Sequence, residues 1–531
     1  MESGNNVVSG PGPNNQVEII DFLSRPDSYG ADGAAVERID THISVIFLVG
    51  DTVYKLKRAV RFPYLDFSSA ARRRRFCEAE VDINRRTAPG LYDGVVAVTV
   101  DESGALALDG AGAPVDWLVK MRRFDQSCLL DRMAERGALS DDIVVRLADS
   151  VAAFHAAAER GPLTGGAAAM RRVAEGCLTE IGRYDAVFDA AAVGRFSAAL
   201  RHALARGEAV LDRRAADGKV RRCHGDLHLR NVYLDGDTPT PFDAIEFNAD
   251  IGVIDTLYDY AFLVMDLVHR DMRAEANLAL NRYLQRSGDY DGLAALALFV
   301  ACRAAIRAHT TASAAERQAS DAEAGRLNAE ARGYLELGLR FLRPSTPGLI
   351  ALGGYSGSGK STLARLLAPR LCGPAGAIAV SSDVVRKVTF GIAPEEKLPA
   401  EAYAEDVSRQ VYDRMRAEAA QALHAGLPVT VDATFMDPIE RRRIAGLAAE
   451  LDTPFAGLWL EVPAAVMAHR VDSRGADASD ADRAVLESQL TADIGPLDWT
   501  RIAAGGGTRD TLAQALAALP ETFHIHQGAT M

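Results

Sequence analysis

The chain has 531 residues, of which 48% are hydrophobic and 25% charged, so it is long enough for about two or three globular domains. Its net charge of -13 at pH 7 argues against a protein that binds nucleic acids or anionic membranes through a general cationic field. The six cysteines are scattered without a C-x-x-C pair, which gives neither a disulfide framework nor a zinc site.

Residues 1–16 are rich in Gly, Asn, Ser and Pro, and they lack both a basic start and an apolar centre. We therefore predict a flexible tail rather than a signal peptide. No run of about 18 uninterrupted apolar residues occurs, so we expect no membrane-spanning helix. Together with the scattered cysteines, this favours a cytoplasmic protein.

The first structured part of the chain is predicted to be rich in β-strands. Residues 41–58 predict two strands joined by a turn at Gly50-Asp51. Alternation in the second strand places Lys55 and Lys57 on the same face. A helix predicted over residues 68–87 follows and carries two candidate acidic partners, Glu78 and Glu80.

The pattern then changes from strands to helices. Residues 95–108 predict a hairpin, and a strand over residues 117–121 leads into Arg122-Arg123-Phe124. Apolar residues recur at helical spacing over residues 130–214. A helix predicted over residues 250–268 carries Asp255, Asp259 and Asp266.

The most informative stretch lies between these helical regions and contains His224, Asp226 and Asn231. Its spacing matches the H-R-D-x-x-x-x-N catalytic loop of protein kinases, with glycine in place of arginine. Asp243 follows the next predicted strand, which ends at Phe242. In phosphoryl transfer, such an aspartate accepts the proton of the attacking hydroxyl, and an asparagine and a second aspartate hold magnesium. The stretch therefore predicts Asp226 as the catalytic residue and Asn231 and Asp243 as metal ligands.

The form His-Gly-Asp-x-His-x-x-Asn resembles the aminoglycoside phosphotransferase and choline kinase branch of the kinase-like fold. This resemblance implies that Lys55 holds the nucleotide phosphates and pairs with Glu80, while Lys57 and Glu78 remain an alternative register. It also places the adenine near residues 122–124.

Two further features of this half concern the binding of phosphate and of the acceptor. The first hairpin lacks a glycine-rich phosphate cover, so the Thr41 and Ser44 hydroxyls are a hypothetical replacement. Asp255 and Asp259 are predicted to contact a cationic or polyhydroxyl acceptor, with an exposed helix face as the equal alternative.

A second nucleotide site is predicted after a Pro/Gly-rich boundary at residues 343–348. A short apolar strand at residues 349–352 leads into a G-x-x-x-x-G-K-[ST] loop and then a helix. Its glycines let backbone N–H groups and the helix N-terminus face phosphate oxygens. The predicted nucleotide-binding residues are Gly354, Ser356, Gly357, Ser358, Gly359, Lys360, Ser361 and Thr362. Among them, Lys360 reaches the terminal phosphates and Ser361 ligates magnesium.

Polar residues follow the next strands of this half. Asp383 comes after the strand at residues 377–381, and Asp432 follows the strand at residues 428–431 as a predicted magnesium ligand. After a further strand, Arg470 and Arg474 are spaced to share one helix face. The polar residues 476–482 suit a mobile lid.

This half resembles the small P-loop kinases of the gluconate kinase, chloramphenicol phosphotransferase, zeta toxin and polynucleotide kinase group. The resemblance implies that Asp383 activates an acceptor hydroxyl and that Arg386 holds a substrate anion. Arg470 or Arg474 would stabilise the transferred charge. The order of the two halves resembles a widespread bacterial fusion.

The predicted fold is thus an α+β, bilobal kinase-like domain over residues 17–343, followed by an α/β P-loop NTPase domain with a doubly wound parallel sheet over residues 344–531. The predicted activity is a bifunctional phosphotransferase that uses ATP and Mg²⁺ at two sites and small hydroxylated acceptors. Two alternatives remain. The P-loop half could be a regulatory nucleotide switch, or the acceptor could be RNA or a protein.

Overall fold

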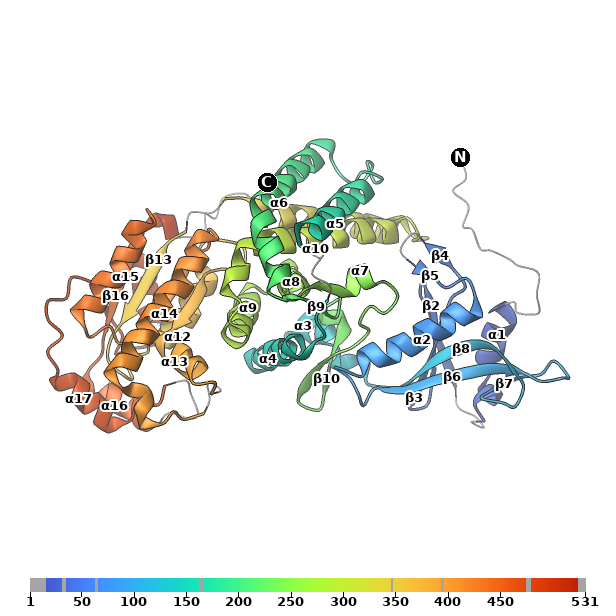
Figure 1. Ribbon diagram of the computed structural model, residues 1–531, viewed down its shortest axis with the longest axis horizontal. Coiled ribbons are helices and arrows are strands. Elements are labelled where there is room, and N and C mark those ends of the chain that lie inside the picture. Colours follow the sequence, from blue (N-terminus) through green and yellow to red (C-terminus); the bar gives the residue numbers. More distant parts are fainter. Residues whose placement is uncertain are drawn as a thin grey trace. The chain divides into compact units, whose positions relative to one another are not determined.

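The structure is a computed structural model that describes residues 16–30, 35–62, 65–161, 166–344, 347–392, 396–473 and 479–523. Figure 1 shows its helices and strands, and the chain falls into two compact units. Unit 1 comprises residues 1–150, 154–162 and 218–259; unit 2 comprises residues 151–153, 163–217 and 260–531. Of the predicted tail, residues 1–15 lie outside the described residues. Gln16 is instead the first residue of helix α1 (Gln16–Leu23).

Unit 1 is built on a six-stranded antiparallel sheet with the order β1-β2-β3-β8-β6-β7. Its strands are β1 (Val36–Asp40), β2 (Ser44–Val49), β3 (Thr52–Lys57), β6 (Tyr92–Val100), β7 (Leu106–Leu108) and β8 (Ala113–Arg122). Helix α2 (Ala70–Asn84) and the short strands β4 (Arg61–Phe62) and β5 (Leu65–Asp66) lie between β3 and β6. One buried cluster joins α1 to the sheet, and another joins α2 to it.

The sequence did not reveal β1, although it pairs with β2 over five residues. Four of its five residues are exposed, because β1 is an edge strand of the sheet. An exposed edge strand needs few apolar residues, so its sequence carries little strand signal. The amide group of Gln16 binds the backbone at and just after the end of β3. It donates to the Lys57 carbonyl at 2.8 Å and accepts from the Ala59 N–H at 2.7 Å.

The remainder of unit 1 consists of short strands, turns and helices around the His224–Asn231 loop. These elements are η2 (Gln126–Cys128), α3 (Leu130–Glu135), α4 (Asp141–Ala157), β9 (Val220–Arg222), η3 (Leu229–Asn231), β10 (Val232–Asp235), β11 (Thr238–Pro241), α7 (Ala249–Gly252) and β12 (Val253–Asp255). The helix predicted over residues 250–268 is interrupted, because residues 253–255 pair with β9 as strand β12. The long helix begins only afterwards, as α8 (Thr256–His269).

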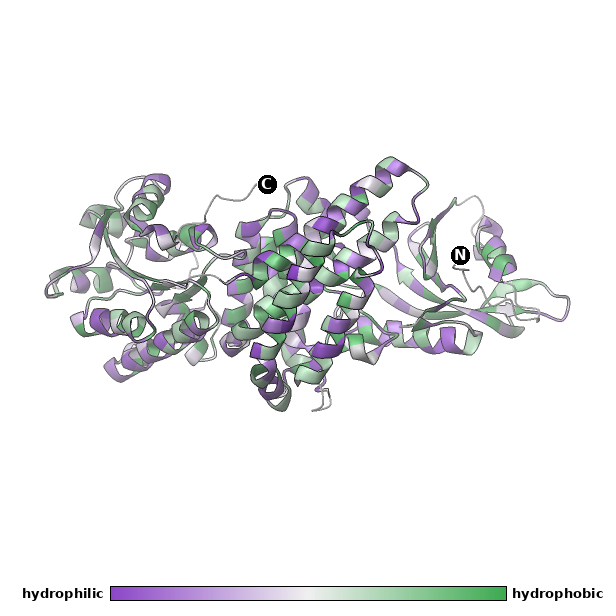
Figure 2. Cartoon of the chain, turned by 90° about the horizontal axis from the view of Figure 1, so that it is seen from above, coloured by the Kyte–Doolittle hydropathy of each residue, from purple (hydrophilic) through white to green (hydrophobic). Residues whose placement is uncertain are grey.

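Unit 2 begins with a group of long helices. They are α5 (Gly166–Ile181), α6 (Ala190–Ala216), the greater part of α8, α9 (Arg273–Ser287), α10 (Leu293–Ala315) and α11 (Asp321–Leu342). Many helices carry both hydrophobic and hydrophilic residues along their length (Figure 2). Among the described residues, the helical segment Tyr290–Ala315 has the length and hydropathy of a membrane span, but 72% of its most apolar window is buried inside the protein. Such burial is typical of the central helix of a folded domain.

The rest of unit 2 is an α/β layer on a five-stranded parallel sheet with the order β14-β15-β13-β16-β17. Its strands are β13 (Leu349–Gly353), β14 (Ile378–Ser381), β15 (Val429–Asp432), β16 (Phe455–Glu461) and β17 (Thr500–Ala503). Its helices are α12 (Lys360–Leu367), α13 (Ser382–Thr389), α14 (Glu405–His424), α15 (Pro438–Glu450), α16 (Ala464–Asp472), α17 (Arg483–Thr491) and α18 (Thr508–Ala518). Buried residues of α12 and α18 form one core with β13 and β16. The predicted parallel α/β fold is confirmed.

Candidate active sites

The His224–Asn231 loop brings the predicted catalytic and metal-binding residues together. Asn231 Nδ2 donates to the Asp226 side chain at 2.8 Å and to the Asp226 carbonyl at 3.0 Å. His228 Nε2 lies 3.4 Å from the same carboxylate. The Asp226 side chain keeps 36% of its surface exposed, so its carboxylate is fixed by the loop and still accessible.

Asp259 of α8 supports the backbone of this loop. Its carboxylate accepts the backbone N–H groups of His224 and Gly225 at 3.0 and 2.8 Å. It also lies 3.1 Å from His155 Nε2, and it is fully buried. Its predicted role in acceptor binding is therefore corrected to a structural one, because both oxygens are already bonded inside the protein.

Asp255 also has a different role from the predicted one. Its Oδ1 accepts the Leu257 N–H at 2.8 Å, so it caps the N-terminus of α8. It is 8% exposed, and so neither of the two predicted aspartates presents an accessible carboxylate to an acceptor. Asp259, His155 and Cys223 could in principle offer three buried metal ligands within 4.8 Å. The backbone bonds to Asp259 account for its carboxylate without a metal.

The two strand lysines and the helix glutamate meet inside unit 1. Lys55 Nζ donates to Glu80 Oε1 at 2.8 Å and to Asp243 Oδ1 at 2.6 Å. Lys57 Nζ donates to the other Glu80 oxygen at 2.5 Å. Burial opposes ionisation of Glu80, but the two lysines outweigh it and lower the pKa of Glu80 to about 2. Glu78 faces away from this cluster and pairs with Arg74 at the surface.

The segment after β11 carries a further acidic residue that sequence reasoning missed. Glu246 Oε1 accepts from Lys57 Nζ at 2.5 Å, and its side chain is 7% exposed. Burial raises the pKa of Glu246, and the nearby Glu80 carboxylate adds to this effect. The only sequence signal was a glutamate three positions after Asp243. Nothing in that spacing identifies Lys57 as its partner.

Of the other residues predicted near this nucleotide site, Thr41 and Phe124 have local partners. Thr41 Oγ1 accepts the Ser44 N–H at 2.9 Å, so this hydroxyl stabilises the turn between β1 and β2. Ser44 Oγ is buried and makes no hydrogen bond within the described residues. Phe124 stacks on Tyr233, with ring centroids 4.5 Å apart.

The donor atoms of this first site fit a magnesium ion. Asp226, Asn231 and Asp243 offer carboxylate and amide oxygens, which are the ligands that Mg²⁺ prefers. The Asp243 side chain is 45% exposed, and only its Oδ1 is bonded to Lys55. Asp243 adopts a left-handed backbone conformation with φ 61°, so the loop turns sharply where this carboxylate is presented.

The P-loop of unit 2 has the conformation that its glycines allow. Gly357 and Gly359 have φ values of 77° and 92°, which side chains other than glycine rarely adopt. A Cβ atom on Gly357 would lie 2.8 Å from the Met467 carbonyl oxygen. Lys360 Nζ curls back over the loop and donates to the Tyr355 carbonyl at 2.9 Å. The loop and its lysine therefore lie at the N-terminus of α12, where an anion is favoured.

Asp432 joins the ends of three elements at this second site. Its Oδ2 accepts from Ser361 Oγ of α12 at 2.8 Å and from Ser381 Oγ of β14 at 3.2 Å. Burial raises the pKa of Asp432 to about 6, and the charge of Asp383 adds to this effect. The paired Ser361 hydroxyl and Asp432 carboxylate are hard oxygen donors, and they fit a magnesium ion held beside the P-loop.

The predicted acceptor residues lie on α13, directly after β14. Asp383 is in the first turn of α13 and is half-buried. Arg386 is 8% exposed; its Nη1 donates to the Ala402 carbonyl at 2.6 Å, and its guanidinium lies over the Tyr403 ring. Arg386 Nε is buried without a hydrogen bond among the described residues. Arg386 Nη1 and the face of the guanidinium are thus engaged by the protein.

Of the two arginines predicted to stabilise transferred charge, the structure describes only Arg470. Arg474 lies outside the described residues. Arg470 Nη1 lies 3.4 Å from the carbonyls of Gly357 and Ser358, and Nη2 donates to the Ala504 carbonyl at 3.0 Å. Arg470 therefore braces the P-loop through its backbone carbonyls in this structure.

A second contact to the loop was missed by sequence reasoning. Gln489 of α17 accepts the Ser356 N–H through its Oε1 at 2.8 Å. Gln489 is 133 residues from Ser356 in the chain, so no local pattern could have indicated this bond.

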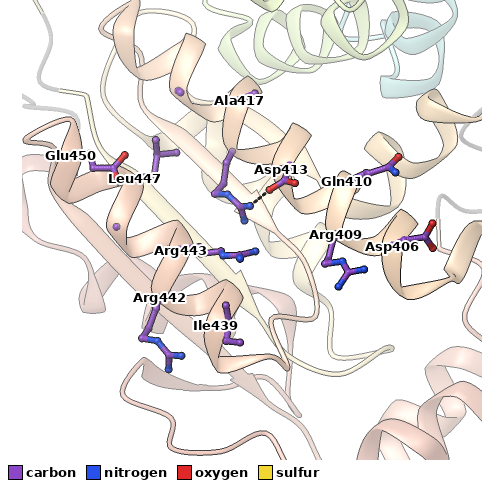
Figure 3. A pocket seen from close by; sticks show the side chains of 13 residues that line it. Asp406, Arg409, Gln410, Asp413, Ala417, Ile439, Arg442, Arg443, Leu447 and Glu450 are labelled. Carbon is purple, nitrogen blue, oxygen red and sulfur yellow. Dashed lines mark hydrogen bonds and ion pairs between the residues drawn. The ribbon is translucent and has the colours of Figure 1, made fainter.

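An open hollow lies elsewhere on unit 2, between α14 and α15 (Figure 3). Arginines from both helices line it together with acidic residues, and Arg416 pairs there with Asp413. None of the predicted site residues lines this hollow.

Comparison with known proteins gives relatives over nearly the whole chain. An uncharacterized protein of Mycobacterium tuberculosis is 27% identical over 498 residues, which cover 92% of this chain and 95% of the relative. An uncharacterized protein of Mycobacterium bovis matches to the same extent.

Solved structures of kinases resemble parts of the chain. A gluconokinase from Sinorhizobium meliloti is 20% identical, with a TM-score of 0.25, and covers 33% of this chain and 92% of its own. A choline/ethanolamine kinase family protein from Mesorhizobium loti is 14% identical, with a TM-score of 0.37, and covers 62% of this chain and 98% of its own.

Two protein families match separate parts of the sequence. The phosphotransferase enzyme family matches residues 66–297, and the AAA domain matches residues 349–492. The first range contains the Asp226 loop, and the second contains the P-loop and Asp432. The chain therefore contains a region that matches the phosphotransferase enzyme family, followed by a P-loop region that matches the AAA domain.

Proposed function

We propose that this protein is a bifunctional, ATP-dependent phosphotransferase with two separate nucleotide sites. Each site would transfer the terminal phosphate of ATP to a hydroxyl group of a small molecule. The observation that carries this proposal is that each half brings a lysine and oxygen donors suited to Mg²⁺ to one place. In unit 1 these are Lys55 and Asp243, which are 2.6 Å apart, and in unit 2 they are Lys360 and the Ser361–Asp432 pair.

At the first site, Asp226 is proposed to orient the acceptor hydroxyl and accept its proton. Asn231 and Asp243 would hold magnesium, and Lys55 would bind nucleotide phosphate oxygens. The bound Mg²⁺ would offset negative charge on the transferred phosphate. The exposed fraction of the Asp226 side chain supports this role, because a general base must be within reach of its substrate.

At the second site, the P-loop N–H groups and Lys360 are proposed to bind the phosphates. Ser361 and Asp432 would hold magnesium, and Asp383 would activate the acceptor hydroxyl. The position of Asp383 directly after β14, next to the strand that ends at Asp432, supports this assignment. Ligands of open parallel sheets generally bind at these carboxyl ends of strands.

A test with two single variants separates the two sites. The wild type, Asp226→Ala and Lys360→Ala are each incubated with ATP and a bacterial metabolite extract, and mass spectrometry detects metabolites that gain one phosphate. We expect each variant to lose a different product. If Lys360→Ala binds no nucleotide at the P-loop yet forms every product, the second half is a switch and the bifunctional proposal fails.

The same incubation tests the class of acceptor. With ATP labelled on the terminal phosphate, we expect the label to appear in small molecules. Label that appears in RNA or protein instead would overturn the small-molecule proposal.

A further inference from the structure

Lys57 is a buried cation that the proposed chemistry does not use. Its side chain is 2% exposed, and it contacts Glu80 Oε2 and Glu246 Oε1, each at 2.5 Å. It does not replace Lys55, since both lysines bind Glu80 through different oxygens. Two lysines on alternate positions of β3 thus share one carboxylate of α2.

The ion pairs form a closed ring through the segment that carries Asp243. Side chains connect Asp243 to Lys55, Lys55 to Glu80, Glu80 to Lys57, and Lys57 to Glu246. Glu246 is three residues after Asp243, so the backbone closes the ring. Both ends of this short segment are therefore fixed to the same glutamate of α2 by way of the two lysines.

Between these ends, the backbone of the segment is held by neutral hydrogen bonds. The Asp243 N–H donates to the Tyr92 hydroxyl at 3.1 Å, and the Ala244 N–H donates to Asn84 Oδ1 at 2.8 Å. The Ile245 N–H donates to the His224 carbonyl at 2.9 Å. The Lys57–Glu246 pair is the charged contact at the far end, and charge-assisted bonds are stronger than neutral ones.

The balance of charge explains what Lys57 contributes. The ring holds two lysines against three carboxylates, so one negative charge is in excess. Without Lys57, Lys55 would face all three carboxylates alone, and the buried Glu246 would compete with Asp243 for it. A buried carboxylate that loses its cation moves or takes up a proton. Either change would displace the segment that presents Asp243.

We propose that Lys57 and Glu246 are positioning residues that hold Asp243 in place for the metal–nucleotide complex of the first site. This inference rests on the proposed function of that site. Neither residue is expected to touch the metal or the nucleotide.

The test uses the full-length Lys360→Ala chain, in which the P-loop site is disabled. Mn²⁺ replaces Mg²⁺ as the probe, and electron paramagnetic resonance measures its binding in the presence of ATP. Glu246→Gln preserves the shape of the side chain, and we expect it to weaken Mn²⁺ binding about tenfold or more. We expect ATP affinity without metal to change little, because Lys55 is retained.

A double variant separates positioning from folding. Lys57→Met/Glu246→Leu removes both charges of the pair, so neither buried charge is left without its partner. We therefore expect a melting temperature close to that of the Lys360→Ala parent. Its Mn²⁺ affinity is expected to stay low, because the charged link to Glu80 is lost. Parental affinity in Glu246→Gln, or recovery of both properties in the double variant, would overturn the positioning role.

Asp243→Asn in the same chain distinguishes this failure from failure of the proposed function. If Asp243→Asn leaves Mn²⁺ binding unchanged, the first site is not the proposed metal–nucleotide site. If Asp243→Asn abolishes binding while Glu246→Gln does not affect it, only the positioning role fails.

Discussion

Asn281 Oδ1 accepts the Ala379 N–H at 2.7 Å, at the edge of the P-loop sheet. The side chain thus makes a hydrogen bond that a neighbouring strand would otherwise make. Its Nδ2 also donates to the Ala377 carbonyl at 3.2 Å. Ala379 lies in β14, the edge strand that leads to Asp383. Asn277 of the same helix α9 donates to the Ala375 and Ala377 carbonyls just before this strand, and Arg273 donates to the Pro369 carbonyl earlier in the chain. An edge that would otherwise be unpaired is thus covered from within unit 2.

Replacement of Asn281 by leucine is expected to loosen β14. The partly buried Ala379 N–H would lose its partner, and because a fully buried unsatisfied group costs about 1–3 kcal/mol, we expect a cost of about 1 kcal/mol. We expect faster hydrogen exchange at Ala379 and a lower melting temperature, both measurable on the full chain. Gln285→Ala, one turn further along α9 at a partly exposed position, serves as the control. Equal exchange rates in the two variants would show that Asn281 does not hold the strand.

Glu80 and Glu78 provide a matched pair on one helix. Glu80→Gln removes the buried carboxylate that the buried Lys57 and the partly buried Lys55 share, so we expect stability to fall by about 3 kcal/mol. Glu78 forms a surface pair with Arg74, so Glu78→Gln is expected to cost less than about 1 kcal/mol. Thermal unfolding of both variants measures the difference. A similar loss in both would contradict the buried cluster.

Whether the sequence predicts a contact depends on how far apart the two residues lie in the chain. Strand alternation places Lys55 and Lys57 on one face, and the loop motifs identify Asp226, Asn231 and Lys360. These patterns are local, and the structure pairs Lys55 with Glu80 and Asn231 with Asp226. Glu246, Asn281 and Gln489 act across long separations in the chain, and no local pattern identifies their partners.

The acidic residues of α8 show why a local pattern can also mislead. Spacing placed Asp259 on a helix near the catalytic loop, but it could not tell whether that helix is covered on all sides. The neighbouring Tyr258, Tyr260 and Phe262 are all buried. A helix that is apolar all round is a core helix, so its carboxylate must find partners inside the protein. Asp259 finds them in the backbone of the catalytic loop.

Asp432 is expected to make stability depend on pH when no metal is bound. Its pKa is about 6 in the folded protein, against an ordinary value of 3.8, because burial disfavours the charged form. The folded state therefore binds more protons than the unfolded state between these values, and stability falls as pH rises through this window. The shift of about two units corresponds to about 3 kcal/mol at most.

Asp432→Asn removes this titration while keeping an oxygen that can accept from Ser361. In EDTA, we expect the variant to melt at a higher temperature than the wild type at pH 8, with the difference shrinking towards pH 4. A difference that does not vary with pH would contradict the raised pKa of Asp432.

Kinetics can distinguish the predicted role of Arg470, stabilisation of transferred charge, from the role that its contacts indicate, bracing of the P-loop. The structure places its guanidinium 3.4 Å from the carbonyls of Gly357 and Ser358 in the P-loop. If the guanidinium braces the loop, Arg470→Leu removes binding that substrate and transition state share, which raises KM for ATP about tenfold and changes kcat little. If it stabilises transferred charge instead, kcat falls and KM is unchanged. We expect the first result, measured as ATP consumption in an Asp226→Ala chain so that only the second site contributes. Arg501→Leu, at an exposed residue of β17 that pairs with Glu461, is the control and should leave both constants unchanged.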